Sequence, residues 1–342
     1  MQKQSPHESC GLFLWIGGHN TSPPIYDQPW GCGFTHPSAN FIQTSEIMSQ
    51  KSKILIQFDS NRHASVFDSI VAIDAGIDHL LTHAAVKPED IESLVHGAMF
   101  TRGANHLQHT ALFFGGNNVA ATEELVRATK KCFFGSLRVS LLSDPNGSNT
   151  TAAAAVLCAQ NELDLGGKNI TILGGTGPVG QRIARLIGGV ASTTKLPSSI
   201  RLGSRSLEKS KGVCDSLTEL TGFQFSPSET NSYDSTRESV HDADVVFAAG
   251  AAGIELLTEG WISNDTAPAV VIDLNAVPPA GIFGVSATDH AEKRNETICY
   301  GAIGVGGLKM KIHKQAIKML FQTNDSTLET EETYRLGVEL NR

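Results

Sequence analysis

A glycine-rich segment at residues 174–180 carries the clearest chemical pattern of this chain. It follows an apolar run and precedes a stretch in which apolar residues recur at helical spacing. Between a strand and a helix, this spacing allows a tight turn at Gly175, close approach of backbone amides to a pyrophosphate at Gly177, and helix packing at Gly180. The pattern predicts a dinucleotide site at Gly175, Thr176, Gly177, Pro178, Val179 and Gly180.

The residues that should end the second strand of such a domain are not acidic. They read Gly203-Ser204-Arg205-Ser206. An acidic side chain here accepts a hydrogen bond from the ribose 2′-hydroxyl of NAD, whereas an arginine accommodates the 2′-phosphate of NADP. Arg205 offers a planar, always-charged fork, and Ser204 and Ser206 offer hydroxyl donors. We therefore predict NADP as the preferred cofactor, with NAD as a second acceptor; the alternative is an Arg205 that only faces solvent.

Two further strand ends are expected to surround the nicotinamide. Ala249 and Gly250 end one apolar run, and Asn275 ends the next. In dinucleotide-binding folds the ring lies at these ends, where small residues let it lie flat. Simple loop geometry is the alternative explanation for these residues.

Apolar runs alternate with helical patterns from residue 53 onward. The first half predicts strands at 54–58, 111–114 and 138–142 and helices at 66–75, 89–100, 119–132 and 152–160. The second half predicts strands at 169–173, 200–203, 245–249 and 270–274 and helices at 178–188, 207–220, 308–321 and 329–340. This rhythm is typical of parallel sheets. We predict an α/β fold in which a Rossmann dinucleotide-binding domain joins an N-terminal α/β substrate domain, with a cleft between them.

The predicted domain boundaries follow the same rhythm. An N-terminal α/β domain spans 48–160, the Rossmann domain spans 161–300, and helices at 301–342 return to the first domain. Residues 1–47 show no sustained periodicity and lack the basic start and apolar core of a signal peptide. Because Met48 leads directly into the first strand, two interpretations stay open: a disordered extension, or a wrongly assigned start.

The composition excludes several classes of function. A net charge of −8 over 342 residues, with no Lys/Arg run, argues against a nucleic-acid partner. The apolar runs are shorter than the roughly 20 residues that cross a bilayer. Six cysteines without a C-x-x-C pair indicate reduced thiols in the cytoplasm rather than zinc or redox chemistry. His106 and His109 lack an acidic or cysteine partner, so we expect loop surface and no metal there.

Several segments, in order along the chain, carry a resemblance to a known family. They are IQFD at 56–59, SVFD at 65–68, FTRG at 100–103, DPNGSNTTAAA at 144–154, GGTGPVG at 174–180, NAVPP at 275–279 and GVGGLKMKIH at 304–313. From Lys53 to Arg342 the chain resembles the NADP-dependent methylene-tetrahydromethanopterin dehydrogenases of bacterial one-carbon metabolism.

The resemblance implies oxidation of a methylene bridge between two pterin nitrogens by hydride transfer to NADP. No proton moves in that step, so positioning and electrostatics matter more than acid–base groups. Tetrahydromethanopterin is the implied substrate, with tetrahydrofolate as the rival because both share the reacting ring. A non-catalytic NADP-binding sensor is the alternative of another class. We also expect a homo-oligomer, since closed symmetric assemblies are common.

Three residues are expected to face the pterin, and the resemblance implies one of them. It places the functional lysine at Lys309, which we expect just after flexible glycines, at a helix start, sharing a face with His313. Thr151 is expected to reach the ligand while Ser148, Asn149 or Thr150 caps the following helix. Asp68 either offsets the positive charge of the product or is a solvated helix residue.

Overall fold

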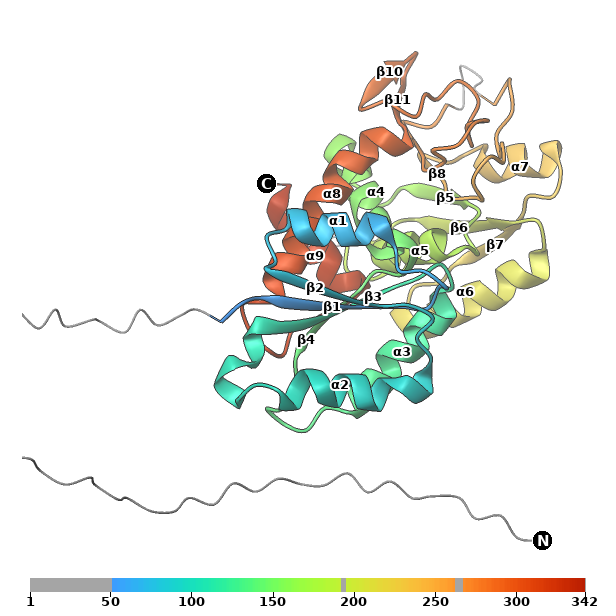
Figure 1. Cartoon of the computed structure of the whole chain (residues 1–342). Helices are drawn as coiled ribbons and strands as arrows, with labels where there is room; N and C mark the ends of the chain where they lie inside the picture. The colour runs from blue at the N-terminus through green and yellow to red at the C-terminus, as the bar shows by residue number, and fades with distance from the viewer. Residues whose placement is uncertain (1–50, 192–194, 262–266, 342) are drawn as a thin grey trace, which may run out of the picture. The chain divides into compact units, whose positions relative to one another are not determined.

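The computed structural model describes residues 51–191, 195–261 and 267–341 (Figure 1). The two interpretations of residues 1–47, and Met48 with them, lie outside the described residues.

The first sheet is parallel throughout and is built mostly from the N-terminal half. It contains β1 (Ile54–Asp59), β2 (His79–His83), β3 (Thr110–Gly115), β4 (Ser140–Ser143) and β12 (Thr327–Leu328). Their order is β12-β4-β3-β1-β2. Strands β2 and β3 therefore lie on opposite sides of β1. At such a reversal of strand order, a ligand crevice is expected at the carboxyl ends of β1 and β3.

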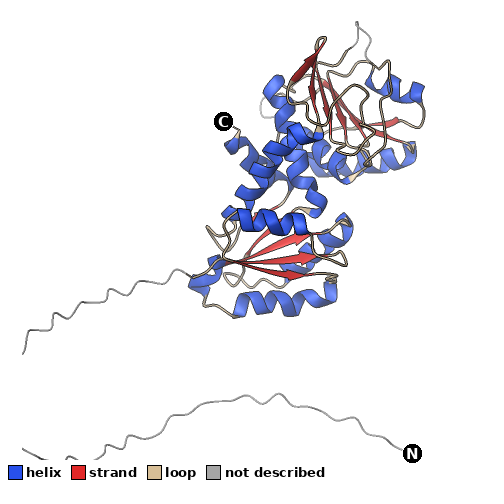
Figure 2. Ribbon diagram, turned by 45° about the horizontal axis from the view of Figure 1, so that its top comes forward, coloured by secondary structure: helices blue, strands red, loops and turns tan. Residues whose placement is uncertain are grey.

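Helices cover both faces of this sheet (Figure 2). On one face, α2 (Ile91–Phe100) and α3 (Val119–Lys131) bury Met99 and Leu125 against Phe58 and Leu112. On the other, α1 (Val66–Asp74) and α8 (Ala302–Met319) bury Val71 and Ile317 against Phe113. A segment from the far end of the chain thereby lies over the first sheet.

Within the described residues, the second sheet has seven strands in the order β10-β11-β9-β8-β5-β6-β7. These are β5 (Asn169–Leu173), β6 (Ser199–Ser204), β7 (Ser226–Glu229), β8 (Val245–Ala248), β9 (Val270–Asp273), β10 (Glu292–Arg294) and β11 (Thr297–Tyr300). The helices α5 (Pro178–Gly188), α6 (Leu207–Thr221) and α7 (Tyr233–Val240) connect them. Only β10 is antiparallel, and the parallel strands have the Rossmann order, so the predicted α/β fold is confirmed.

The alanine-rich helix α4 (Ser148–Glu162) lies at the centre of the helical packing. Its residues Ala152 to Ala155 are fully buried, and it packs against α5, α8 and α9 (Thr330–Leu340). Small side chains let these helices approach closely. Helix α4 thus joins elements that belong to both sheets.

The glycine-rich segment is helical from residue 302, with Gly301 as its N-cap, which corrects our expectation of a flexible loop before Lys309. Helix α8 begins at Ala302, so Lys309 lies well inside it. The reason is close packing: a Cβ on Gly301 would lie 2.0 Å from the carbonyl oxygen of Ser286, and one on Gly304 would lie 1.8 Å from that of Asp289. These glycines let the helix start press against the backbone of 286–289.

Candidate active site

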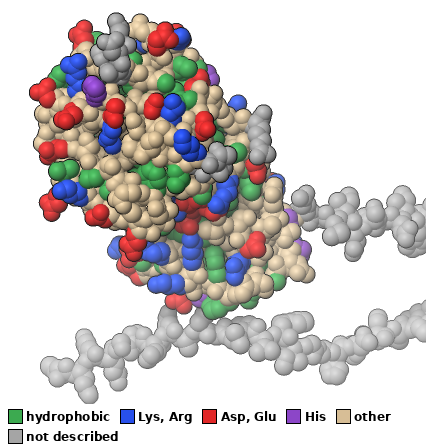
Figure 3. Space-filling model, turned by 180° about the vertical axis from the view of Figure 1, so that it is seen from behind, with side chains coloured by type: hydrophobic (Ala, Val, Ile, Leu, Met, Phe, Trp, Pro, Cys, Tyr) green, Lys and Arg blue, Asp and Glu red, His purple; other side chains and the backbone are tan. Residues whose placement is uncertain are grey.

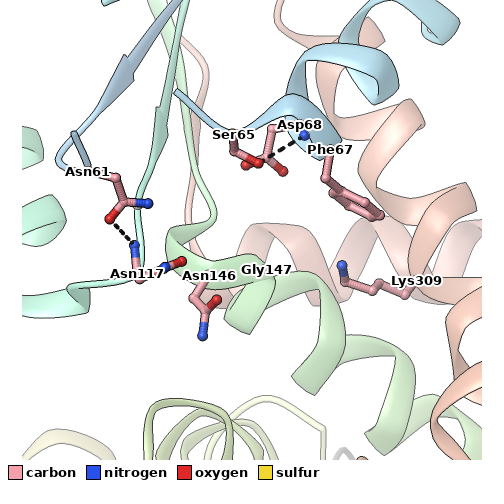
Figure 4. Close-up of a pocket in the computed structure, with 9 residues that line it drawn as sticks. Asn61, Ser65, Phe67, Asp68, Asn117, Asn146, Gly147 and Lys309 are labelled. Carbon is pink, nitrogen blue, oxygen red and sulfur yellow. Dashed lines mark hydrogen bonds between the residues drawn. The ribbon is translucent and has the colours of Figure 1, made fainter. Parts of the chain in front are cut away.

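A pocket of about 230 Å³ lies where β1, β3 and β4 end, at the predicted ligand crevice of the first sheet (Figure 4). Polar and charged side chains dominate its wall. The lining residues are Asn61, Ser65, Phe67, Asp68, Gly116, Asn117, Asn146, Gly147 and Lys309.

Two buried carboxylates at strand ends hold the loops that form this wall. Asp59 accepts from the amides of Asn61 (2.8 Å) and Ser65 (2.9 Å). Asp144 accepts from the Asn149 amide (2.8 Å) and from the Thr150 hydroxyl (2.6 Å). The N-cap of α4 is therefore Gly147 and not, as predicted, Ser148, Asn149 or Thr150, and the Asp144 carboxylate accepts from the first amides of the helix. The strand-end carboxylate wins because it is fully buried and must be hydrogen-bonded.

The turn between β4 and α4 brings its backbone to the pocket. Asn146 (φ 54°) and Gly147 (φ 62°) are both left-handed, a conformation that glycine and asparagine tolerate best. A Cβ on Gly147 would lie 2.9 Å from Lys309 Nζ. A side chain at 147 would therefore displace the lysine.

Asp68 lies in the first turn of α1, whose N-cap is Ser65. Its side chain is only 9% exposed, and burial raises its pKa to about 6. The Ser65 hydroxyl and the charge of Lys309 oppose this rise, whereas Asp144 and Asp59 add to it. A carboxyl group that titrates near neutrality in a pocket is typical of functional sites.

Lys309 reaches the same pocket from α8. Its Nζ lies 4.7 Å from the centroid of the Phe67 ring, within the range of a cation–π interaction. The structure thus brings two of the predicted pterin residues, Lys309 and Asp68, to one pocket. Lys311 is exposed on another face of α8.

His313 is one turn further along α8 and does not reach the pocket. It is fully buried and stacks on Phe113, with ring centroids 5.6 Å apart. Burial lowers the pKa of His313, so the ring is neutral. Neither ring nitrogen has a hydrogen-bond partner in the part of the chain that the structure describes.

Thr151, the third predicted pterin residue, is half-buried and does not line the pocket. Its Oγ1 lies 4.0 Å from the point that a Cβ on Gly147 would occupy. Sequence reasoning missed the residues Asn61, Phe67, Asn117 and Asn146, although Phe67 and Asn146 stand inside segments that carried the family resemblance.

Two glycines of the loop in the second sheet have no room for a Cβ. A Cβ on Gly175 would lie 2.8 Å from the Ile172 carbonyl oxygen, and one on Gly180 would lie 2.7 Å from that of Gly174. Gly177 is the N-cap of α5, and no described side chain caps that end. The first amides of α5 are therefore available to an anion, and the loop fits a pyrophosphate.

The residues predicted to bind the adenosine ribose follow β6. Arg205 is exposed. The Ser206 hydroxyl caps α6 by accepting from the Lys209 amide at 3.2 Å. Ser204 Oγ lies 3.4 Å from Thr176 Oγ1, so the strand end and the glycine loop are in contact.

The residues predicted to surround the nicotinamide follow β8 and β9. Gly250 is exposed, and Ala249 is half-buried with its amide bonded to Leu173. The Asn275 side chain accepts from the Gly253 amide (3.1 Å) and donates to the Pro279 carbonyl (2.8 Å). Its amide group therefore shapes the loops around this site.

The two histidines of the H-x-x-H pattern lie in a 3-10 segment, Ala104–His109, with ring centroids 6.4 Å apart. Among the described residues, no group of three histidine, cysteine or acidic side chains is arranged to hold a metal. No helix within the described ranges is long and apolar enough to cross a membrane.

Comparison with known proteins agrees with this geometry. The sequence model "Methylene-tetrahydromethanopterin dehydrogenase, N-terminal" matches residues 66–146. "NAD(P)-dependent methylenetetrahydromethanopterin dehydrogenase" of Methylorubrum extorquens is 30% identical over 82% of this chain and 95% of its own length. The chain belongs to the methylene-tetrahydromethanopterin dehydrogenase family.

A second relative from the same organism, "Bifunctional protein MdtA", is 39% identical over 84% of this chain and 99% of its own length. The predicted family resemblance is thereby confirmed. Among solved structures, 5-ketofructose reductase of Gluconobacter sp. strain CHM43 is 11% identical, covers 85% of this chain and 99% of its own, and has a TM-score of 0.45.

Proposed function

We propose that this family member oxidises methylene-tetrahydromethanopterin to methenyl-tetrahydromethanopterin and passes the hydride to NADP. The observation that carries the proposal is the pocket that joins Asp68 and Lys309 at the ligand crevice of the first sheet. Most of its wall falls inside the segment, 66–146, that matches the family. The activity named for the 30% identical relative supports the same reaction.

NADP, when bound, supplies the hydride acceptor of this reaction. The methylene carbon loses a hydride, and the pterin becomes an amidinium cation without losing a proton. The chain's own groups must then hold the pterin, keep water out and suit a cation. An ionised Asp68, which burial disfavours, becomes more stable as the positive charge forms beside it.

Lys309 has a different task, because an ammonium close to a forming cation opposes it. We propose that it binds a carbonyl oxygen of the pterin and so orients the ring. Its position over the face of Phe67 holds the charge to one side of the pocket. Thr151 does not line the pocket, so its contact with the ligand stays a prediction.

For the cofactor, we propose that the loop from Gly175 to Gly180 holds the pyrophosphate and that Arg205 with Ser204 and Ser206 receives the 2′-phosphate. The exposed position of Arg205 leaves it free to meet an anion. Ala249, Gly250 and Asn275 form the nicotinamide end. The domain boundaries, a cytoplasmic location and a homo-oligomer stay predictions.

The decisive experiment is a spectroscopic assay of nicotinamide reduction. Purified protein is mixed with methylene-tetrahydromethanopterin or methylene-tetrahydrofolate, each with NADP and with NAD. The fastest reduction is expected for tetrahydromethanopterin with NADP. NADP binding without turnover of either pterin would favour the sensor interpretation. Faster turnover of methylene-tetrahydrofolate would make that compound the assigned substrate.

A further inference from the structure

Arg182 is a buried cation that ties three helices together. The residue is 9% exposed and belongs to α5. Its Nη1 donates to the Pro178 carbonyl at 3.1 Å, its Nη2 donates to Glu123 of α3 at 2.9 Å, and its Nε donates to the side-chain oxygen of Asn149 of α4. Burial lowers the pKa of Arg182, and Glu123 opposes that shift.

One end of this network is the cofactor loop. Pro178 is the first residue of α5 and directly follows Gly177, the N-cap whose neighbouring amides are available to the pyrophosphate. A guanidinium bound to the Pro178 carbonyl therefore fixes the entry of α5. Any shift of the loop on cofactor binding must move or strain this contact.

The other end is the turn that lines the pterin pocket. The Asn149 side chain donates to the Ser143 carbonyl at 2.5 Å and accepts from the Thr330 hydroxyl at 2.9 Å, while its amide donates to Asp144. These bonds anchor both ends of the turn that presents Asn146 and Gly147 to the pocket. Arg182 is the basic group that orients the Asn149 oxygen.

We propose that Arg182 is a positioning residue that sets the spacing between the two ligands, joining the cofactor loop to the pterin-binding turn. This inference rests on the proposed function. Hydride transfer needs the reacting atoms roughly 3–3.5 Å apart, and a misplacement of about 1 Å costs about 10²-fold in rate. Only a planar guanidinium can serve these separated acceptors at once, whereas a lysine presents a point charge.

Arg185 provides a matched control on the same helix. It forms an equally close ion pair, with Nη2 2.6 Å from Glu331 of α9, but it contacts neither the glycine loop nor the turn at 144–149. A purely structural ion pair on α5 would make the two arginines equivalent. The proposal requires them to differ.

The test compares Arg182→Met, Arg182→Lys, Arg185→Met and Asn149→Ala in the full chain. We expect kcat to fall at least about tenfold in both Arg182 variants. The kinetic isotope effect measured with a dideuterated methylene substrate should be larger than in the wild type. NADP affinity, measured by fluorescence titration, should change less than about threefold. Arg185→Met should keep the kcat of the wild type. Asn149→Ala and Arg182→Met should be non-additive, because both break one contact.

Hydrogen exchange gives a readout that needs no turnover. NADP alone should slow amide exchange over residues 144–151 in the wild type, and this protection should vanish in Arg182→Met and persist in Arg185→Met. Unchanged kcat in the Arg182 variants, an equal loss in Arg185→Met, or protection that survives without Arg182 overturns the inference. If Arg182→Met does not fold, Arg182→Lys decides. Absence of wild-type turnover counts against the proposed function, and the exchange experiment then judges Arg182 separately.

Discussion

The two sheets of this protein offer ligand sites at equivalent places, but one site consists mainly of side chains and the other mainly of backbone. The first sheet lines its crevice with side chains that come from three strand–helix turns and from α8. The second presents the backbone of one short loop, 174–180, in which added side chains would meet backbone atoms. Figure 3 shows the opposite side of the molecule from Figure 1, where charged side chains of both signs are scattered over the described surface.

This difference matches what each site has to recognise. A pyrophosphate is an anion that backbone amides at a helix start bind well, so the second site needs close approach rather than special side chains. A neutral pterin that becomes a cation requires a tunable charge, which only side chains supply. The first site accordingly contains Asp68, whose pKa is raised to about 6, facing Lys309.

The largest effect is expected where the backbone site is blocked. In Gly180→Ala the new Cβ would lie 2.7 Å from both the Gly174 carbonyl oxygen and the Gly175 Cα, which cannot move aside without opening the loop. We expect NADP affinity to fall by at least about 100-fold, or about 2.7 kcal/mol. Titration of NADP against intrinsic fluorescence measures it.

Gly212→Ala is the matched control for that substitution. Gly212 lies in α6, and nothing stands within 4 Å of the position of its missing Cβ. Alanine is the better helix former, so this variant should bind NADP normally and gain up to about 1 kcal/mol of stability. Equal losses in both variants would show that the glycine loop is not the cofactor site.

The contrast between the sites also explains what the sequence could predict. The glycine loop is contiguous, and its strand and helix, 169–173 and 178–188, were predicted with the boundaries that the structure has. Strands β2, β7, β10, β11 and β12 were missed. Of these, β2, β7 and β10 are largely exposed, and β12 has two residues. Strands that depend on distant partners give a weak local pattern.

The pterin site was predicted only in part, because distant segments build it. Lys309 was named from the family resemblance and Asp68 from its place after the first strand, and no local pattern shows that they share a pocket. The bonds from the first helix amides to Asp144 were missed because serine, asparagine and threonine at the helix start offered an equally good local explanation. The burial of the Asp144 carboxylate, which depends on the tertiary structure, explains why this group accepts from the helix amides.

Asp68→Asn tests whether the ionised carboxylate of Asp68 destabilises the folded protein. The folded-state pKa of Asp68, about 6, lies above the usual 3.8, so the folded chain binds more protons between these values. Stability therefore falls as pH rises through this window. At pH 8 we expect the free energy of unfolding of the variant to exceed that of the wild type by about 1–3 kcal/mol. At about pH 4.5 this difference should be smaller. Urea unfolding at the two pH values measures the difference.

The same variant should lose activity while it gains stability. In the wild type, kcat/KM should rise through about pH 6 as Asp68 ionises, and Asp68→Asn should lack this rise. Asp215→Asn, an exposed carboxylate on α6, should change neither quantity. A stability gain that is the same at both pH values would show that the charge of Asp68 does not cause it.

Lys309→Ala tests the opposite charge in the same pocket. If the ammonium orients the pterin, kcat/KM for the pterin should fall at least about tenfold, or about 1.4 kcal/mol, with NADP affinity unchanged. Because the Lys309 charge lowers the pKa of Asp68, the rise of kcat/KM near pH 6 should move to higher pH in this variant. Lys311→Ala, exposed on another face of α8, should have no effect. Equal losses in both lysine variants, or weaker NADP binding in Lys309→Ala alone, would move the pterin contact elsewhere.

The smallest effect is expected from Arg205→Ala, where the second site does depend on a side chain. Arg205 is exposed, so its attraction to a 2′-phosphate is screened by water and salt, and we expect the KM for NADP to rise only about three- to tenfold. The KM for NAD should stay constant, because NAD lacks that phosphate. Raising the salt concentration should shrink the difference between variant and wild type. A parallel rise for both cofactors would show that the substitution disturbs the strand end, and unchanged NADP kinetics would remove Arg205 from the site.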